Sequence, residues 1–176
     1  PGISQEWGIS QTALGFVLAA ELVGMAFGSI LLGGVADKYG RRTTLLGCLI
    51  VMSAGMFLAT TSSSANILMV WRVLTGLGIG GMLSCTNATV AEFSNTKWRS
   101  MCISLMVIGY PLGGVIGGEI AQKYLLVTFD WRSVFYFGSI VTGFLIPVVY
   151  FLVPESVHWL TRKQPENALD KINHSL

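Results

Sequence analysis

The most informative stretch of the sequence is Gly33-Gly34-Val35-Ala36-Asp37-Lys38-Tyr39-Gly40-Arg41-Arg42, which separates two long apolar runs. Its charges are too dense to lie inside a bilayer, because a single Arg, Lys or Asp at the centre of a membrane helix costs about 2.5 to 3.5 kcal/mol. Its glycines are unfavourable in the interior of a helix. The stretch therefore predicts a short turn at the membrane surface, between two membrane-spanning helices.

The overall composition is that of a membrane protein. Hydrophobic residues make up 52% of the 176 residues and charged residues only 11%, against about 25% charged residues in an average soluble domain. The formal net charge of +2 is small and the basic residues are scattered, which argues against nucleic-acid binding. The three cysteines lie singly in apolar runs, without the close spacing of a zinc site. We therefore expect no metal and no cofactor.

Five apolar runs are long enough to cross a bilayer, since about 20 helical residues span the hydrocarbon core. After them, the polar tail 154–176 has apolar residues at helical spacing, which predicts a cytoplasmic amphipathic linker. The chain is thus predicted to be an all-α membrane protein, with a transmembrane bundle over residues 1–153. The predicted spans cover about residues 12–36, 43–61, 67–91, 100–126 and 132–153.

The basic residues divide unevenly between the two ends of these spans. If the turn at Asp37 faces the cytoplasm, eight of the eleven Lys and Arg residues fall on that side, whereas Lys123 and Arg132 fall on the other. The positive-inside rule then places the N-terminal end of the chain outside and the C-terminal end in the cytoplasm. We expect an integral protein of the bacterial cytoplasmic membrane.

Three charged residues inside the predicted spans are candidates for substrate or proton coupling: Glu21, Arg72 and Glu119. A charged side chain in a membrane helix is expected to face the bundle interior and to have a partner or a function. A carboxyl group whose charge depends on both burial and a nearby Arg is suited to taking up and releasing protons. Two alternatives remain open, because Arg72 can extend outward to the interface and Glu119 can touch water near the end of its span.

Glycines spaced by four residues predict close packing between helices. Small residues at this spacing line one face of a helix and let another backbone approach. A proline within one of these runs permits a kink. We expect the helix face that carries Gly24 and Gly28 to meet the face of the last run, from Gly109 to Gly117. The residues are Gly24, Gly28, Gly76, Gly80, Gly109, Pro111, Gly113 and Gly117.

The spacing Gly33-x-x-x-Asp37-x-x-Gly40-Arg41-Arg42 between two membrane helices resembles the loop between helices 2 and 3 of the major facilitator superfamily. Leu68-x-x-x-Arg72-x-x-x-Gly76 resembles the helix 4 pattern of its proton-coupled members. Each six-helix half of that family is built from two inverted three-helix repeats. The resemblance implies that the chain holds helices 2 to 6 of the N-terminal half, with helix 1 and the C-terminal half missing. Such a fragment is not expected to transport alone, because the family's substrate cavity forms between the halves.

Within the family, the stretch from Ser104 to Gly114 and the Pro154-Glu155-Ser156 segment most resemble aromatic acid:proton symporters. This implies proton-coupled uptake of a small organic acid. A sugar porter is the alternative, although Val157-His158 stands where sugar porters usually carry Pro-Arg. The resemblance also implies a cytoplasmic gate in which opposite charges hold the inner side closed, although ordinary surface ion pairs would give the same sequence pattern. The residues of this gate and of the loop motif would be Gly33, Asp37, Gly40, Arg41, Arg42, Glu92, Arg99 and Glu155.

Two other classes of protein fit the sequence less well. A membrane scaffold or sensor that does not transport need not carry the insertion cost of Glu21 and Arg72. An enzyme is not expected, because the spans contain no HExxH or GxSxG motif and both histidines lie in the tail. The expected partners are a small organic acid, protons, the lipid bilayer, and the missing helix 1 and C-terminal half, without nucleic acid.

Overall fold

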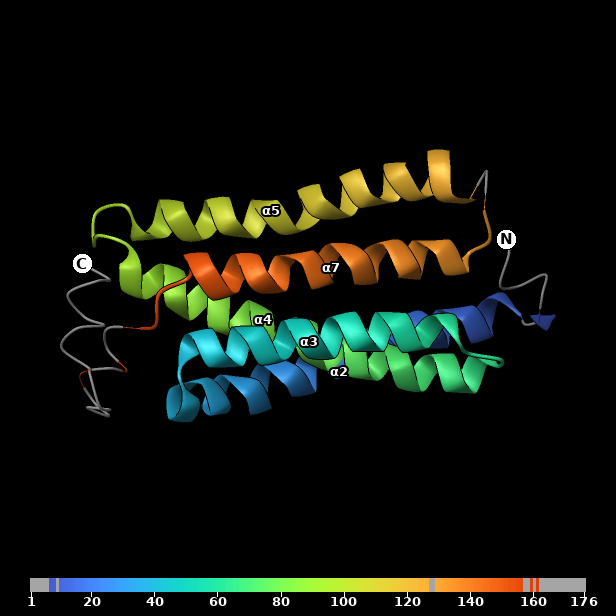
Figure 1. Cartoon of the computed structure of the whole chain (residues 1–176), viewed down its shortest axis with the longest axis horizontal. Helices are drawn as coiled ribbons and strands as arrows, with labels where there is room; N and C mark the ends of the chain where they lie inside the picture. The colour runs from blue at the N-terminus through green and yellow to red at the C-terminus, as the bar shows by residue number, and fades with distance from the viewer. Residues whose placement is uncertain (1–6, 9, 127–128, 157–158, 160, 162–176) are drawn as a thin grey trace.

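The computed structural model describes residues 7, 8, 10–126, 129–156, 159 and 161, and these form a bundle of long helices without any strand (Figure 1). Counting η1 as a continuation of α5, the described residues contain five helices long and apolar enough to cross a membrane. The predicted all-α membrane fold is therefore confirmed. The elements are α2 (Gln11–Tyr39), α3 (Arg41–Thr60), α4 (Ala65–Phe93), α5 (Arg99–Ile120), the π-helical η1 (Ala121–Leu125) and α7 (Arg132–Leu152).

The helices alternate in direction, so their connections gather at two ends (Figure 1). The turn between α2 and α3, the loop between α4 and α5, and the end of α7 lie at one end, which we call the inner end. The start of α2, the loop between α3 and α4, and the loop before α7 lie at the opposite, outer end. Among the described basic residues, the inner end carries Lys38, Arg41, Arg42, Lys97 and Arg99.

The turn between α2 and α3 is shorter than the sequence predicted. Helix α2 continues to Tyr39 and α3 begins at Arg41, so only Gly40 lies outside a helix. Gly40 has a φ of 102°, a conformation that glycine adopts without steric cost, and it therefore reverses the chain within one residue. The expectation that Gly33 and Gly34 lie in the turn was wrong. Both glycines lie inside α2, which keeps its helical backbone hydrogen bonds beyond the apolar run as far as Tyr39.

Helix α4 is the centre of the bundle. It packs along α2 on one side and against α3 on another, while α3 also packs against α7. The side chain of Ser64 caps the start of α4 by accepting a hydrogen bond from the Ile67 N–H at 3.5 Å. Buried core residues cluster near both ends of the bundle, namely Val17, Ala59 and Leu68, and Ala36, Leu45 and Cys85.

Glycines on both α2 and α4 bring these two helices into backbone contact. A Cβ placed on any of the four glycines at this interface would lie only 2.0 to 2.2 Å from a carbonyl oxygen of the other helix. Real side chains never approach a backbone so closely, so glycine alone permits this packing. The facing residues are Gly24 with Val73, Gly28 with Leu77, Gly76 with Glu21, and Gly80 with Met25.

Helix α5 is attached to the bundle only loosely. None of its residues is buried, and a Cβ on Gly109, Gly113 or Gly117 would meet no atom within 4 Å. The expectation that this glycine face meets that of α2 was wrong, because the α2 glycines interlock with matching glycines on α4. Pro111 lies inside α5, which continues beyond it to Ile120.

Candidate functional site

The outer half of the bundle contains an ion pair within the membrane-spanning region, which we call the intramembrane pair. Arg72 Nη1 on α4 donates a hydrogen bond to Glu21 Oε2 on α2 at 2.6 Å. Each side chain is 22% exposed. Gly76, one turn after Arg72, lies against the Glu21 carbonyl group. The glycine contact between the helices thus brings the two charges within reach, and each offsets the cost of inserting the other.

Aromatic side chains extend from the intramembrane pair toward the outer end. The Arg72 guanidinium lies 4.9 Å from the ring centroid of Phe135 on α7. Phe135 packs edge to face on Trp131, with ring centroids 5.9 Å apart, and Trp131 packs in the same way on Trp7 at 5.3 Å. Arg72, which lies on α4, therefore contacts α7 as well as α2.

Glu119 lies away from this pair. Its carboxylate forms an ion pair with Lys123, one turn further along, and the two side chains are 57% and 68% exposed. This is the arrangement expected of an acid that touches water near the end of its span. The structure therefore brings together Glu21 and Arg72 and leaves Glu119 outside the candidate coupling site.

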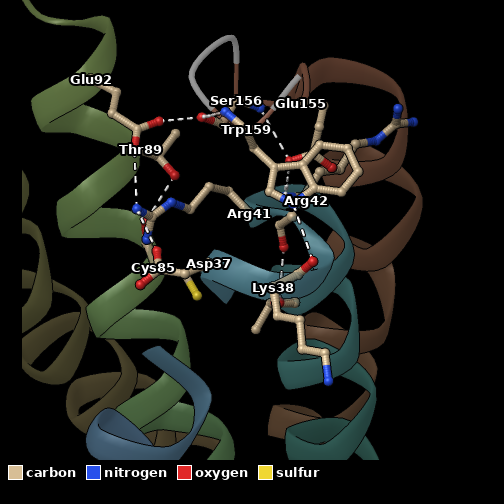
Figure 2. Close-up of polar contacts among 12 residues, drawn as sticks. Asp37, Lys38, Arg41, Arg42, Cys85, Thr89, Glu92, Glu155, Ser156 and Trp159 are labelled. Atoms are coloured by element: carbon tan, nitrogen blue, oxygen red, sulfur yellow. Dashed lines mark hydrogen bonds and ion pairs between the residues drawn. The ribbon is translucent and has the colours of Figure 1, made fainter. Parts of the chain in front are cut away.

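The inner end contains a cluster of opposite charges, which we call the inner cluster: Asp37, Arg41, Glu92 and Ser156 (Figure 2). Arg41 Nη2 lies 3.0 Å from Asp37 Oδ1 and 3.0 Å from Glu92 Oε1. The Ser156 hydroxyl donates a hydrogen bond to Glu92 Oε2 at 2.5 Å. These contacts tie together the end of α2, the start of α3, the end of α4 and the segment after α7.

A second set of contacts beside the inner cluster holds the start of α3. The Arg42 backbone N–H donates to Glu155 Oε1 at 3.1 Å, so this carboxylate caps the helix. A Cβ on Gly40 would lie 2.8 to 2.9 Å from the Glu155 carboxylate atoms. Glycine is therefore needed at this turn for space as well as for its positive φ. The Arg42 side chain donates to the Tyr150 carbonyl group at the end of α7.

Two of the predicted gate residues have other surroundings. A Cβ on Gly33 would lie 2.9 Å from Ser84 Oγ, so Gly33 faces α4. Arg99 is exposed, and it makes no ion pair within the described ranges. Glu92, near the end of α4, thus pairs with Arg41 at the start of α3 and not with Arg99 at the start of α5.

Sequence reasoning did not select several residues that the structure brings into these sites. Ser156 follows Glu155 directly, so the Pro-Glu-Ser segment was a signal for it. Trp159 donates its ring N–H to the Lys38 carbonyl group at 3.3 Å, and Phe135 contacts Arg72. Single aromatic residues near span ends are ordinary in membrane proteins, so nothing in the sequence marked these two.

An apolar cavity of about 650 Å³ lies between α4 and α5. Met82, Thr86 and Asn87 line it from α4, and Met106 and Tyr110 line it from α5. Across the described part of the chain, no group of three or more His, Cys, Asp or Glu side chains is placed to hold a metal ion.

Comparison with known proteins gives one family and several relatives. The family described as Major Facilitator Superfamily matches residues 1–174. The chain is 32% identical to the 4-hydroxybenzoate transporter PcaK of Pseudomonas putida, over 100% of this chain and 39% of the relative. It is also 32% identical to the gallate transporter of Pseudomonas putida, over 93% of this chain and 36% of the relative. The chain thus spans less than two fifths of the length of these curated relatives.

A solved structure shares the fold. The xylose transporter XylE from E. coli, in a partially occluded inward-open conformation, aligns with a TM-score of 0.73 and 22% sequence identity. The alignment covers 93% of this chain and 43% of that one.

Proposed function

This chain belongs to the Major Facilitator Superfamily, and we propose that it works as part of a proton-coupled transporter that takes up a small aromatic acid. The observation that carries the proposal is the intramembrane pair of Glu21 and Arg72, at 2.6 Å between helices of spanning length. The names of two relatives specify ring carboxylic acids, 4-hydroxybenzoate and gallate. The likeness to the xylose transporter concerns the fold alone and gives no support to a sugar substrate.

The pair can couple a proton to an organic anion by exchange of partners. When the Glu21 carboxylate takes up a proton, it loses its charge and its attraction for Arg72. The Arg72 guanidinium then has donors available for the carboxylate of an incoming acid, which it can bind in a bidentate manner. One proton and one anion would thus be accepted together. A scaffold without transport activity would gain nothing from this exchange, yet it would carry the insertion cost of both charges.

We propose that the inner cluster is the cytoplasmic gate of this transporter. The excess of basic residues at the inner end supports a cytoplasmic location in a bacterial inner membrane. Arg41 bridges Asp37 and Glu92, so separation of α2, α3 and α4 at this end would break both ion pairs. Partly exposed pairs contribute about 1 kcal/mol or less each. A gate made of such contacts can hold the inner side closed and still open during each cycle.

The open face of α5 is proposed as the seat of helix 1 in the complete transporter. In a fold of two inverted three-helix repeats, α2 and α5 are equivalent helices. Gly24 and Gly28 on α2 seat α4. Gly109 and Gly113 on α5 have the same spacing, a Cβ on either would meet no described atom within 4 Å, and Gly109 lines the 650 Å³ cavity. A helix preceding α2 would fill this cavity and pack on the α5 glycines.

Substitution of the α5 glycines tests the proposed seat. Gly113→Leu is expected to leave the thermal stability of the 176-residue chain in detergent nearly unchanged, because a side chain there meets open space. In the complete transporter the same substitution should lower the folded yield severalfold, since an overpacked helix contact costs about 1 to 3 kcal/mol. Equal folded yields of the wild type and the variant in the complete transporter would contradict the seat.

The substrate class is tested by uptake in whole cells. Cells that express the complete transporter are expected to accumulate labelled 4-hydroxybenzoate, and a protonophore should abolish the accumulation. Unlabelled benzoate or gallate should compete, whereas xylose should not. Cells without the transporter report the passive diffusion of the protonated acid. Uptake of xylose instead would assign the chain to the sugar porters. If the cells took up neither compound, the proposed function would lose its support.

A further inference from the structure

The intramembrane pair does not by itself fix the orientation of the Arg72 side chain. Only Nη1 of the guanidinium contacts Glu21, so the pair lacks the bidentate geometry that aligns a guanidinium with a carboxylate. Arg72 Nε is buried and has no hydrogen-bond partner within the described residues. A guanidinium held by one contact can rotate about it. Another group is needed to hold it in place.

That group is the aromatic ring of Phe135. The ring centroid lies 4.9 Å from the guanidinium carbon of Arg72. The face of a phenyl ring carries negative charge density and attracts a cation at this distance, and the attraction is larger where water is excluded. We infer that Phe135 is a positioning residue, whose ring face holds the Arg72 guanidinium toward Glu21.

The contact gives α7 a part in controlling the pair. Glu21 and Arg72 come from α2 and α4, whereas Phe135 lies in the first turn of α7 and packs on Trp131. Arg132 and Asp130, near this end of α7, form an ion pair at 3.3 Å. A shift of the outer end of α7 would therefore change the orientation of Arg72. The effect of such a shift on transport rests on the proposed function, but its effect on the orientation of Arg72 toward Glu21 does not.

The first experiment measures the pair without transport. Thermal unfolding of the complete transporter in detergent is followed for Glu21→Gln, Arg72→Gln and the double variant, in the wild-type and in the Phe135→Leu background. We expect the coupling energy between positions 21 and 72 to fall to about half or less when Phe135 is replaced. Coupling of equal size in both backgrounds would overturn it, whatever the substrate of the transporter proves to be.

The second experiment separates the charge on the ring face from its bulk. Phenylalanines with one, two and three ring fluorines are incorporated at position 135, since fluorine withdraws charge from the ring face and hardly changes its shape. Proton-driven uptake of 4-hydroxybenzoate should fall stepwise along the series, whereas Phe135→Tyr should retain it. Phe144→Leu is the matched control, because Phe144 on the same helix is 71% exposed.

Each outcome of the second experiment decides a different claim. Uptake that stays constant along the fluorine series would leave the proposed function standing and overturn the role of Phe135. Absence of proton-driven uptake in the wild type would overturn the proposed function, and the unfolding cycles would then decide the role of Phe135 alone. If Phe135→Leu fails to fold, the same cycles are measured with trifluorophenylalanine at position 135.

Discussion

Gly28→Leu is expected to separate α2 from α4 and to prevent the chain from folding stably. A Cβ at this position would lie 2.1 Å from the Leu77 carbonyl oxygen. The obstacle is backbone, so no side-chain movement can relieve it. The helices would have to move apart along their whole contact, with loss of packing and of the ion pair between Glu21 and Arg72. We expect a loss well above the about 1 to 3 kcal/mol typical of overpacked cores.

The measurement is the thermal unfolding midpoint and the monodisperse yield of the 176-residue chain in detergent. Gly15→Leu is the matched control, since Gly15 lies on the same helix and a Cβ there meets no atom within 4 Å. The control should behave as the wild type. If Gly28→Leu were as stable as Gly15→Leu, α2 and α4 would not pack as described.

Arg72→Gln is expected to lower proton-driven uptake by about tenfold or more, since loss of 1.4 kcal/mol of binding already gives a tenfold effect. The substitution removes the charge that pairs with Glu21 and leaves that carboxylate without its partner in a low-dielectric region. It also removes the proposed site for the substrate carboxylate. The measurement is the initial rate of labelled 4-hydroxybenzoate uptake in cells, normalised to the amount of transporter in the membrane.

Lys123→Gln is the control for the loss of a positive charge. Lys123 also forms an ion pair, with Glu119, but both side chains are more than half exposed, and exposed pairs contribute little. We expect its uptake to be within about twofold of the wild type. Equal loss of uptake in the two variants would mean that Arg72 has no special role.

The helical architecture and the intramembrane charges could be predicted from the sequence because both follow from the cost of placing polar groups in lipid. Spanning helices need about 20 apolar residues, which hydropathy reveals directly. The same cost made Glu21 and Arg72 conspicuous within their spans. The glycines of α2 and α4 were also visible as spacings of four residues, although which helix each one faces was not.

The remaining features depend on relations between distant residues, which spacing does not encode. A positive φ at one glycine made the turn at Gly40 a single residue. Glu119 and Arg72 both lie inside predicted spans, but Glu119 is on the loosely attached α5, where its side chain is exposed and pairs with Lys123. Phe135 on α7 lies close to Arg72 on α4 in a bundle where α3 packs on both of these helices. A single phenylalanine near a span end carries no sign of that contact.

The intramembrane pair is proposed to couple proton movement to uptake of the acid. The most direct test compares two modes of 4-hydroxybenzoate transport by Glu21→Gln in proteoliposomes of the complete transporter, with protein-free liposomes as the background. A permanently neutral residue at position 21 imitates the protonated carboxyl group. We expect Glu21→Gln to retain exchange of labelled for unlabelled acid without a gradient and to lose accumulation driven by an imposed proton gradient. Gradient-driven accumulation equal to that of the wild type would contradict it.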